Sequence, residues 1–276
     1  RGVRAAVGTQ VPEDDDRLMR TAAARAGALA AAVALAGCGT VQQASERFDY
    51  QLGGAYVTDG GVDTVVRDST AEPLPGAYSI CYVNGLQTQP GSAWNPELLL
   101  TDSGGSAVID PEWPDEQILD PGTAEKRAGI DEVVGPIIDG CAAHGFDAVE
   151  IDNLDVWTRF PDRIDENAVL ELARLYSDRA HASGMEIAQK NAPAGAGRLR
   201  TQLGFDFAIA EECLAYDECG SYTEEYGSRV YDIEYTDNLP ASFEDMCARR
   251  DRPPVTILRD RGLVDPTDPE YVYRQC

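Results

Sequence analysis

Short apolar runs alternate with longer amphipathic segments along the chain from residue 48 onward. The short runs are rich in β-branched and aromatic residues, which is typical of buried strands. Nine runs are predicted to be strands: Phe48–Leu52, Thr64–Arg67, Tyr78–Val83, Gln117–Leu119, Ala148–Ile151, Glu186–Gln189, Phe205–Ala210, Val230–Glu234 and Val255–Leu258. Strands that alternate with helical segments predict parallel βαβ units rather than a sandwich of two sheets.

This arrangement predicts an α/β fold, a single-domain TIM-type (β/α)8 barrel over residues 48–276. Because a closed barrel of this type needs only eight strands, we expect Gln117–Leu119 to lie outside the closed sheet. Apolar positions recur at helical spacing over residues 130–141 and 169–180, and both segments read as helices that coat the barrel. Pro136 lies inside the first of them and should kink or shorten it.

The first 38 residues have a different pattern. Met19 begins a short positively charged segment, an apolar run follows from residue 26 to 36, and the run leads to Cys38. This resembles a bacterial lipoprotein signal, in which the cysteine is acylated and becomes the first mature residue. A soluble alanine-rich helix is the alternative, but it would lack a polar face. We therefore expect residues 1–38 to be an over-called N-terminus plus signal peptide, Cys38 the lipidation site, and residues 39–47 a short linker.

A lipoprotein signal implies that the mature protein lies outside the cytoplasm, anchored to the cell membrane by lipid or secreted. No stretch after residue 38 is long and apolar enough to span a bilayer. Six cysteines follow Cys38: Cys81, Cys141, Cys213, Cys219, Cys247 and Cys276. An even number in an exported protein favours disulfides over metal ligands, and the close pair Cys213 and Cys219 is the candidate that can be named.

The formal charge of the chain is −25, and it is about −26 without the five arginines and four acids of residues 1–38. Such a charge disfavours nucleic acid as a partner. It would attract a polycation, although an acidic surface also serves solubility alone. Composition therefore excludes one class of partner and leaves the substrate open.

Polar residues close five of the predicted strands, at the end of a parallel barrel where active sites lie. They are Asp152-Asn153-Leu154-Asp155, Lys190-Asn191, Glu211-Glu212, Glu234-Tyr235 and Arg259-Asp260. The two histidines, His144 and His181, each precede a glycine and the next strand, which places them at the opposite face. The predicted active-site face therefore has no histidine for a Ser-His-Asp triad or for a histidine-ligated metal site. We expect carboxyl groups to carry out any acid–base chemistry.

Asp152 and Glu211 are the predicted catalytic pair because each directly follows an apolar strand, and the two strands are two apart in chain order. Hydrolysis of a glycosidic bond needs one carboxyl group to protonate the leaving oxygen and a second to attack the anomeric carbon or activate water. Lys190, on the strand between them, could keep one of the pair ionised. Two further acids have structural interpretations: Asp155 would cap the next helix, and Glu212 would pair with an arginine on the rim.

In these features the chain resembles the endo-α-1,4-polygalactosaminidases, glycoside hydrolase family 114. The resemblance covers roughly residues 48 to 265 and rests on an ordered set of motifs: Tyr50-Gln51-Leu52-Gly53, Cys81-Tyr82, Gly145-Phe146-Asp147, Glu150-Ile151-Asp152-Asn153-Leu154-Asp155, Lys190-Asn191, Glu211-Glu212-Cys213, Glu218-Cys219 and Glu234-Tyr235. It implies a barrel that cuts internal α-1,4 linkages in galactosamine-containing polysaccharide. It also implies a retaining mechanism with Asp152 as nucleophile and Glu211 as acid/base.

The resemblance further implies a set of residues that line the sugar subsites: Asp68, Tyr82, Asp120, Asn153, Asp155, Lys190, Asn191, Glu234 and Tyr235. No cofactor or metal is expected, and the expected partner is the polysaccharide, for which a cationic galactosamine polymer is the candidate. We expect a monomer. Two alternatives stay open. One is a non-catalytic sugar-binding lipoprotein on the same barrel, whose carboxylates only hold ammonium or hydroxyl groups. The other is an exo-acting enzyme similar to α-galactosidases, which would release monosaccharide alone.

Overall fold

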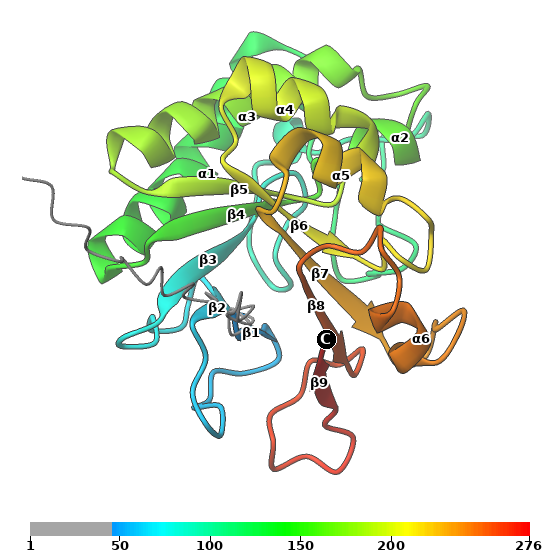
Figure 1. Cartoon of the computed structure of the whole chain (residues 1–276). Coiled ribbons are helices and arrows are strands. Elements are labelled where there is room, and N and C mark those ends of the chain that lie inside the picture. Colours follow the sequence, from blue (N-terminus) through cyan, green and yellow to red (C-terminus); the bar gives the residue numbers. More distant parts are fainter. Residues whose placement is uncertain (1–45) are drawn as a thin grey trace, which may run out of the picture. The chain divides into compact units, whose positions relative to one another are not determined.

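The computed structural model describes residues 46–276, which contain a barrel of parallel strands (Figure 1). Its eight parallel strands are β1 (Phe48–Gln51), β2 (Thr64–Asp68), β3 (Tyr78–Asn84), β4 (Ala148–Asp152), β5 (Glu186–Lys190), β6 (Phe207–Glu211), β7 (Val230–Tyr235) and β8 (Val255–Arg259). Each strand pairs with the next one along the chain. The predicted barrel and eight of the nine predicted strands are therefore confirmed. The predicted signal peptide, Cys38 and all but the last two residues of the predicted linker lie outside the described residues.

The ninth predicted run, residues 117–119, lies outside the barrel sheet as expected. It forms only isolated antiparallel bridges, for example between Ile118 and Gln87, within the long segment that joins β3 to the first helix. A ninth strand that the sequence analysis missed, β9 (Tyr273–Gln275), pairs antiparallel with β8. The side chain of Gln275 accepts a hydrogen bond from the backbone N–H of Phe48 at 3.2 Å, so β9 joins β8 to β1 at the seam of the barrel.

Helices follow five of the strands and cover the outer face of the sheet. They are α1 (Ala124–His144), α2 (Val156–Arg159), α3 (Glu166–Ala182), α4 (Ala196–Leu203), α5 (Cys219–Tyr226) and α6 (Phe243–Cys247), with short 3-10 turns η1 (Pro96–Leu98) and η2 (Pro193–Gly195). In Figure 1 the helices gather over β3 to β6, whereas β1 and β2 are followed by loops. The two predicted helices correspond to α1 and α3. None of the helices in the described part of the chain is long and apolar enough to cross a membrane.

Pro136 does not shorten α1, so this half of the prediction is wrong. The helix continues for eight residues beyond it, to His144. Pro136 lies on the exposed side of the helix. The backbone carbonyl that loses its partner to the proline ring can therefore bind water, and the buried side of the helix keeps its hydrogen bonds.

Alternation along each strand sorts side chains between two apolar layers. On β4, Ala148 belongs to the inner core of the barrel, whereas Val149 and Ile151 pack into the outer core beneath the helices. Because successive side chains of a strand point to opposite faces, Glu150 and Asp152 share the inner face with Ala148. The pleat of the sheet, together with the strand end, thus directs Asp152 into the barrel mouth.

Three disulfides connect the elements around the barrel. Cys81 of β3 is bonded to Cys141 of α1, Cys213 to Cys219 after β6, and Cys247 of α6 to Cys276. The predicted pair Cys213–Cys219 is confirmed, and the structure also gives the other two pairings, which the sequence left open. Each of the six cysteines that follow Cys38 is used in one of these bonds.

A buried ion pair closes the seam between β8 and β1. The guanidinium of Arg259 lies 2.8 Å from the carboxylate of Asp49, and neither side chain has any exposed surface. The same guanidinium donates to the backbone carbonyls of Tyr50, Val264 and Val272, so it also holds the segment that leads to β9. This single side chain therefore ties together both ends of the barrel sheet.

Replacing Arg259 with leucine should lower the free energy of unfolding by about 3–5 kcal/mol, because the carboxylate of Asp49 would stay buried without a counter-charge. Urea unfolding followed by circular dichroism measures this change. Arg274→Ala on β9 is the matched control, since the side chain is 46% exposed, and it should cost about 0.5 kcal/mol or less. A loss below about 1 kcal/mol for the leucine variant would contradict the role of the buried pair.

Candidate active site

A buried ammonium group stands at the centre of the barrel mouth. The Nζ atom of Lys190, at the end of β5, lies 3.2 Å from Oε2 of Glu211 and 3.9 Å from Oδ2 of Asp152. Oδ2 of Asp152 and Oε2 of Glu211, the oxygens of the two predicted catalytic carboxylates, are therefore at most 7.1 Å apart. Their side chains are 18% and 26% exposed, whereas that of Lys190 is only 2% exposed. A ligand in the mouth can reach both carboxylates, and the ammonium lies below them.

Two tyrosines hold the two carboxylates in place. The hydroxyl of Tyr82, on β3, donates to Asp152 at 2.6 Å, and that of Tyr235, on β7, donates to Glu211 at 2.5 Å. The side chain of Asn191 donates to Glu211 at 3.1 Å and accepts from its backbone N–H at 2.8 Å. Four of the sequence-predicted site residues, including Lys190, thus surround the predicted pair directly.

Asp152, Lys190, Glu211 and their hydrogen-bond partners form one cluster at the barrel mouth. Charges and hydrogen bonds determine which of its groups are ionised. Burial would raise the pKa of Glu211, but the charge of Lys190 and the hydrogen bonds from Tyr235 and Asn191 outweigh it and leave the pKa below its usual value. Burial would lower the pKa of Lys190, but Asp152, Glu211 and Glu150 together raise it well above its usual value. Without a bound substrate, Lys190 is therefore a cation and Glu211 an anion at neutral pH.

The chain turns sharply after three successive strands that carry the cluster. Asn153 follows β4, Asn191 follows β5 and Glu212 follows β6. Their backbone φ angles are 64°, 49° and 59°, respectively. Asparagine tolerates this left-handed conformation, whereas Glu212 pays a cost of about 1–2 kcal/mol. Two hydrogen bonds from Arg261 to the Glu212 carboxylate, at 2.7 and 3.1 Å, help to hold it there. The arginine partner predicted for Glu212 is thus observed.

The remaining predicted residues at the mouth contact side chains that were not among the predicted site residues. The side-chain amide of Asn153 donates to Asn84 at 2.8 Å, and the side-chain oxygen of Asn153 accepts from Arg159. Asp155 pairs with Arg159 at 3.2 Å and makes no side-chain capping bond to α2, so the capping interpretation is wrong. Asp68 pairs in register with Tyr82, and its carboxylate accepts hydrogen bonds from Thr70.

Two predicted subsite residues are not brought to the cluster. Asp120 lies before α1, where its carboxylate pairs with Lys126 and accepts the backbone N–H of Gly122. Glu234 has no exposed surface and accepts the backbone N–H of Leu214 at 2.8 Å. Tyr235 occupies the inner face of β7, so the preceding residue must point outward. The subsite assignment of Glu234 is therefore corrected, whereas that of Asp120 stays a prediction.

Two residues of the cluster were given no role by the sequence analysis. The hydroxyl of Tyr50, on β1, lies 2.7 Å from the Nζ atom of Lys190, and the carboxyl group of Glu150 lies behind it. Glu150 is two residues before Asp152 on the same strand. The two-residue period of a strand was therefore the signal that could have placed it on the same face.

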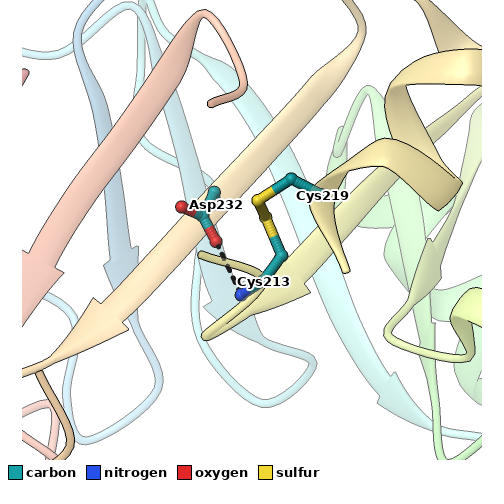
Figure 2. A group of neighbouring side chains, drawn as sticks. All are labelled: Cys213, Cys219 and Asp232. Atoms are coloured by element: carbon teal, nitrogen blue, oxygen red, sulfur yellow. Dashed lines mark hydrogen bonds between the residues drawn. A yellow bond between two sulfur atoms is a disulfide. The ribbon is translucent and has the colours of Figure 1, made fainter. Parts of the chain in front are cut away.

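Asp232 and the disulfide Cys213–Cys219 form the one tight group of potential metal ligands among residues 46–276 (Figure 2). The two sulfur atoms are bonded to each other and offer no thiolate. Asp232 instead accepts the backbone N–H of Cys213 at 3.2 Å. Together with Glu234 on the same face of β7, it anchors the loop after β6 that follows Glu211.

The histidines lie at the opposite end of the barrel, as predicted. His144 ends α1, and His181 in the last turn of α3 lies 2.9 Å from the carboxylate of Asp206, just before β6. Neither residue is near the cluster at the carboxyl ends of the strands. The cluster in the described barrel mouth therefore contains carboxyl groups, one lysine, tyrosines and Asn191, and no histidine.

Comparisons with known proteins agree with this architecture. The family model of glycoside-hydrolase family GH114 matches residues 30–276. The crystal structure of Ega3 from Aspergillus fumigatus, in complex with galactosamine, has a TM-score of 0.67 and 18% identity over 84% of this chain and 95% of that chain. The glycoside hydrolase domain of PelA from Pseudomonas aeruginosa has a TM-score of 0.51 and 13% identity over 83% and 98%. A search of curated proteins gives no match.

The buried carboxyl group of Glu234 should make stability depend on pH. Burial, largest among its causes, raises its pKa to about 7. A raised carboxyl pKa favours the folded state at low pH, and this contribution is lost as the pH rises from about 4.5 to 7. Relative to Glu234→Gln, the wild-type chain should therefore lose roughly 3 kcal/mol of unfolding free energy across this window.

Urea unfolding of both chains at a series of pH values measures this difference. Glu224→Gln, on an exposed part of α5, is the control and should follow the wild-type curve. Parallel curves for wild type and Glu234→Gln would show that the carboxyl group does not titrate in the folded protein over this range.

Proposed function

The chain belongs to glycoside hydrolase family 114 and is a glycoside hydrolase, and we propose that it cleaves internal α-1,4 linkages in galactosamine-containing polysaccharide. The observation that carries this proposal is the convergence of Asp152 and Glu211, both partly exposed, on one ammonium group at the carboxyl ends of the strands. Two accessible carboxyl groups at this spacing can flank a single glycosidic bond.

The proposed mechanism is retaining. Asp152 attacks the anomeric carbon while Glu211 gives its proton to the leaving oxygen, and a covalent glycosyl-enzyme forms. Glu211 then removes a proton from water, whose oxygen attacks the anomeric carbon and releases Asp152. Glu211 has to gain a proton before the first step. A bound sugar ring favours this, because it displaces water from the carboxylate and thereby raises its pKa.

Tyr82 and Lys190 would support the nucleophile. The Tyr82 hydroxyl, at 2.6 Å, orients the Asp152 carboxylate, and the ammonium at 3.9 Å favours its ionised form. Tyr235 and Asn191 would hold Glu211 in position for both proton transfers. Hydrogen-bond partners that hold the two carboxylates in place support a two-step displacement, because the reacting atoms have to stay aligned in both steps.

Charge supports a galactosamine polymer as the substrate. The chain has a formal charge of −25, and the amino groups of a deacetylated galactosamine polymer are cationic. The structure of Ega3 holds galactosamine. Attraction of a polycation to an acidic surface would speed the encounter between enzyme and substrate, and this attraction would weaken as salt is added.

Asp152→Asn should lower kcat on polygalactosamine by about three orders of magnitude or more, because an amide cannot form the glycosyl-enzyme. Chromatography of the products measures both rate and pattern, and wild type should give oligomers of intermediate length. Asp139→Asn, on the exposed side of α1, is the matched control and should keep the wild-type rate.

In the same assay, NMR of the first products should show the α anomer, as retention requires. Full activity of Asp152→Asn would reject the catalytic pair, and binding without cleavage by wild type would identify a sugar-binding protein. Monosaccharide as the sole product would identify an exo-acting enzyme.

We also propose that the protein works outside the cytoplasm on a lipid anchor at Cys38. Three disulfides fit an oxidising compartment, because cytosolic proteins keep their thiols reduced. In a bacterial host, the wild-type protein should therefore fractionate with membranes. Cys38→Ser should lose this association and the added lipid mass, measured by immunoblot and mass spectrometry. An unchanged membrane fraction for the variant would contradict the anchor.

A further inference from the structure

A third carboxyl group lies beneath the proposed catalytic pair. Glu150 shares the inner face of β4 with Asp152 and has no exposed surface. The hydroxyl of Tyr50 lies 3.1 and 3.3 Å from its two oxygens, and the Nζ atom of Lys190 lies 3.7 Å from Oε1. Within residues 46–276, Tyr50 is the only hydrogen-bond partner of this carboxyl group. The proposed mechanism assigns no step to Glu150.

Charge balance in this part of the barrel is unequal. The six titratable groups that face Lys190 come from five strands: Tyr50 of β1, Tyr82 of β3, Glu150 and Asp152 of β4, Glu211 of β6 and Tyr235 of β7. Three of these are carboxyl groups, and one ammonium group is within 4 Å of all of them. Three ionised carboxylates beside one ammonium group would leave a net charge of −2 in this part of the barrel, which is costly where the dielectric constant is low.

Geometry decides which of the three carboxyl groups is neutral. Lys190 is within hydrogen-bond distance of Glu211 at 3.2 Å but not of Glu150 at 3.7 Å or Asp152 at 3.9 Å, and Asp152 accepts a hydrogen bond from Tyr82 at 2.6 Å instead. Asp152 and Glu211 are partly exposed, whereas Glu150 has no contact with water. Burial raises the pKa of Glu150 to about 8, although Lys190 opposes this shift. The proton therefore belongs on the deepest of the three groups.

We propose that Glu150 is a positioning residue that stays protonated while the enzyme works, so that the charge of Lys190 acts on Asp152 and Glu211 alone. This inference rests on the proposed function of that pair. Tyr50 transmits the effect, because its hydroxyl lies 2.7 Å from the ammonium and also contacts Glu150. Ionisation of Glu150 would draw Lys190 toward the barrel interior and away from Glu211, which would disturb both carboxylates.

The test compares the dependence of kcat on pH in wild type and Glu150→Gln. Glutamine has the shape of the protonated acid but cannot ionise. We expect kcat of the variant to fall less than tenfold at pH 6, and the ratio of wild-type to variant kcat to decrease above pH 8, where Glu150 of wild type ionises. Substrate amino groups also titrate in this range, but they are common to both enzymes, so the ratio of the two kcat values isolates Glu150. KM should change little, because Glu150 is out of reach of the sugar.

Glu186→Gln is the matched control, since Glu186 begins β5 at the opposite end of the barrel and pairs with Arg229. It should reproduce the wild-type pH profile. A loss of more than a hundredfold in Glu150→Gln at every pH would overturn the proposal, because it would show that the lysine needs an ionised Glu150. A variant profile parallel to that of wild type would overturn it as well.

A second measurement does not depend on catalysis. The difference between the infrared spectra of wild type and Glu150→Gln at pH 6 should contain one carbonyl band of a buried carboxylic acid that only wild type has, because the band of Glu234 is common to both proteins and cancels. Absence of this band from wild type would overturn the inference whatever the enzyme cleaves. Wild-type protein that has the band but shows no hydrolysis would instead refute the proposed function and leave the protonation state of Glu150 standing.

Discussion

One buried ammonium group organises the chemistry of this barrel. Lys190 brings a positive charge into the interior, and the acids around it can be close together only because that charge is there. Its position is itself determined by the barrel, since residues two apart on a parallel strand share the inner face and five neighbouring strands end at the same level. Without the lysine, Asp152 and Glu211 would repel each other across the mouth, and Glu150 would have no charged neighbour of opposite sign.

The parts of this arrangement that follow from local pattern could be predicted from the sequence. Each of the eight parallel strands is an apolar run, and an acid directly after such a run is costly unless it has a task, which pointed to Asp152 and Glu211. Glu234 met the same criterion and was wrong, because it belongs to the outer face of β7 while its neighbour Tyr235 belongs to the inner face. Of two consecutive residues at a strand end, such as Glu234 and Tyr235, only one can point into the barrel mouth, because successive side chains of a strand face opposite sides of the sheet.

What the sequence could not show depends on contacts between distant segments. Strand β9 has only three residues, too few for a periodic signal, and it forms because β8 offers an unpaired edge. The strand period could have placed Glu150 on the inner face, but not its contacts with Tyr50 and Lys190, which come from strands a hundred residues before and forty after it. The helix around Pro136 continues because tertiary packing of its buried face outweighs the local preference of one residue.

The seam of the barrel has a consequence for how the chain reaches its native state. Gln275 and Phe48 are 227 residues apart in sequence, and the ion pair of Arg259 with Asp49 spans 210. Contacts of such high sequence separation form late and slowly, because the loop between them has to close first. An open, curved sheet with exposed edges should therefore precede the closed barrel. We expect nascent molecules to be most vulnerable to aggregation at that stage, when a chaperone would protect them most.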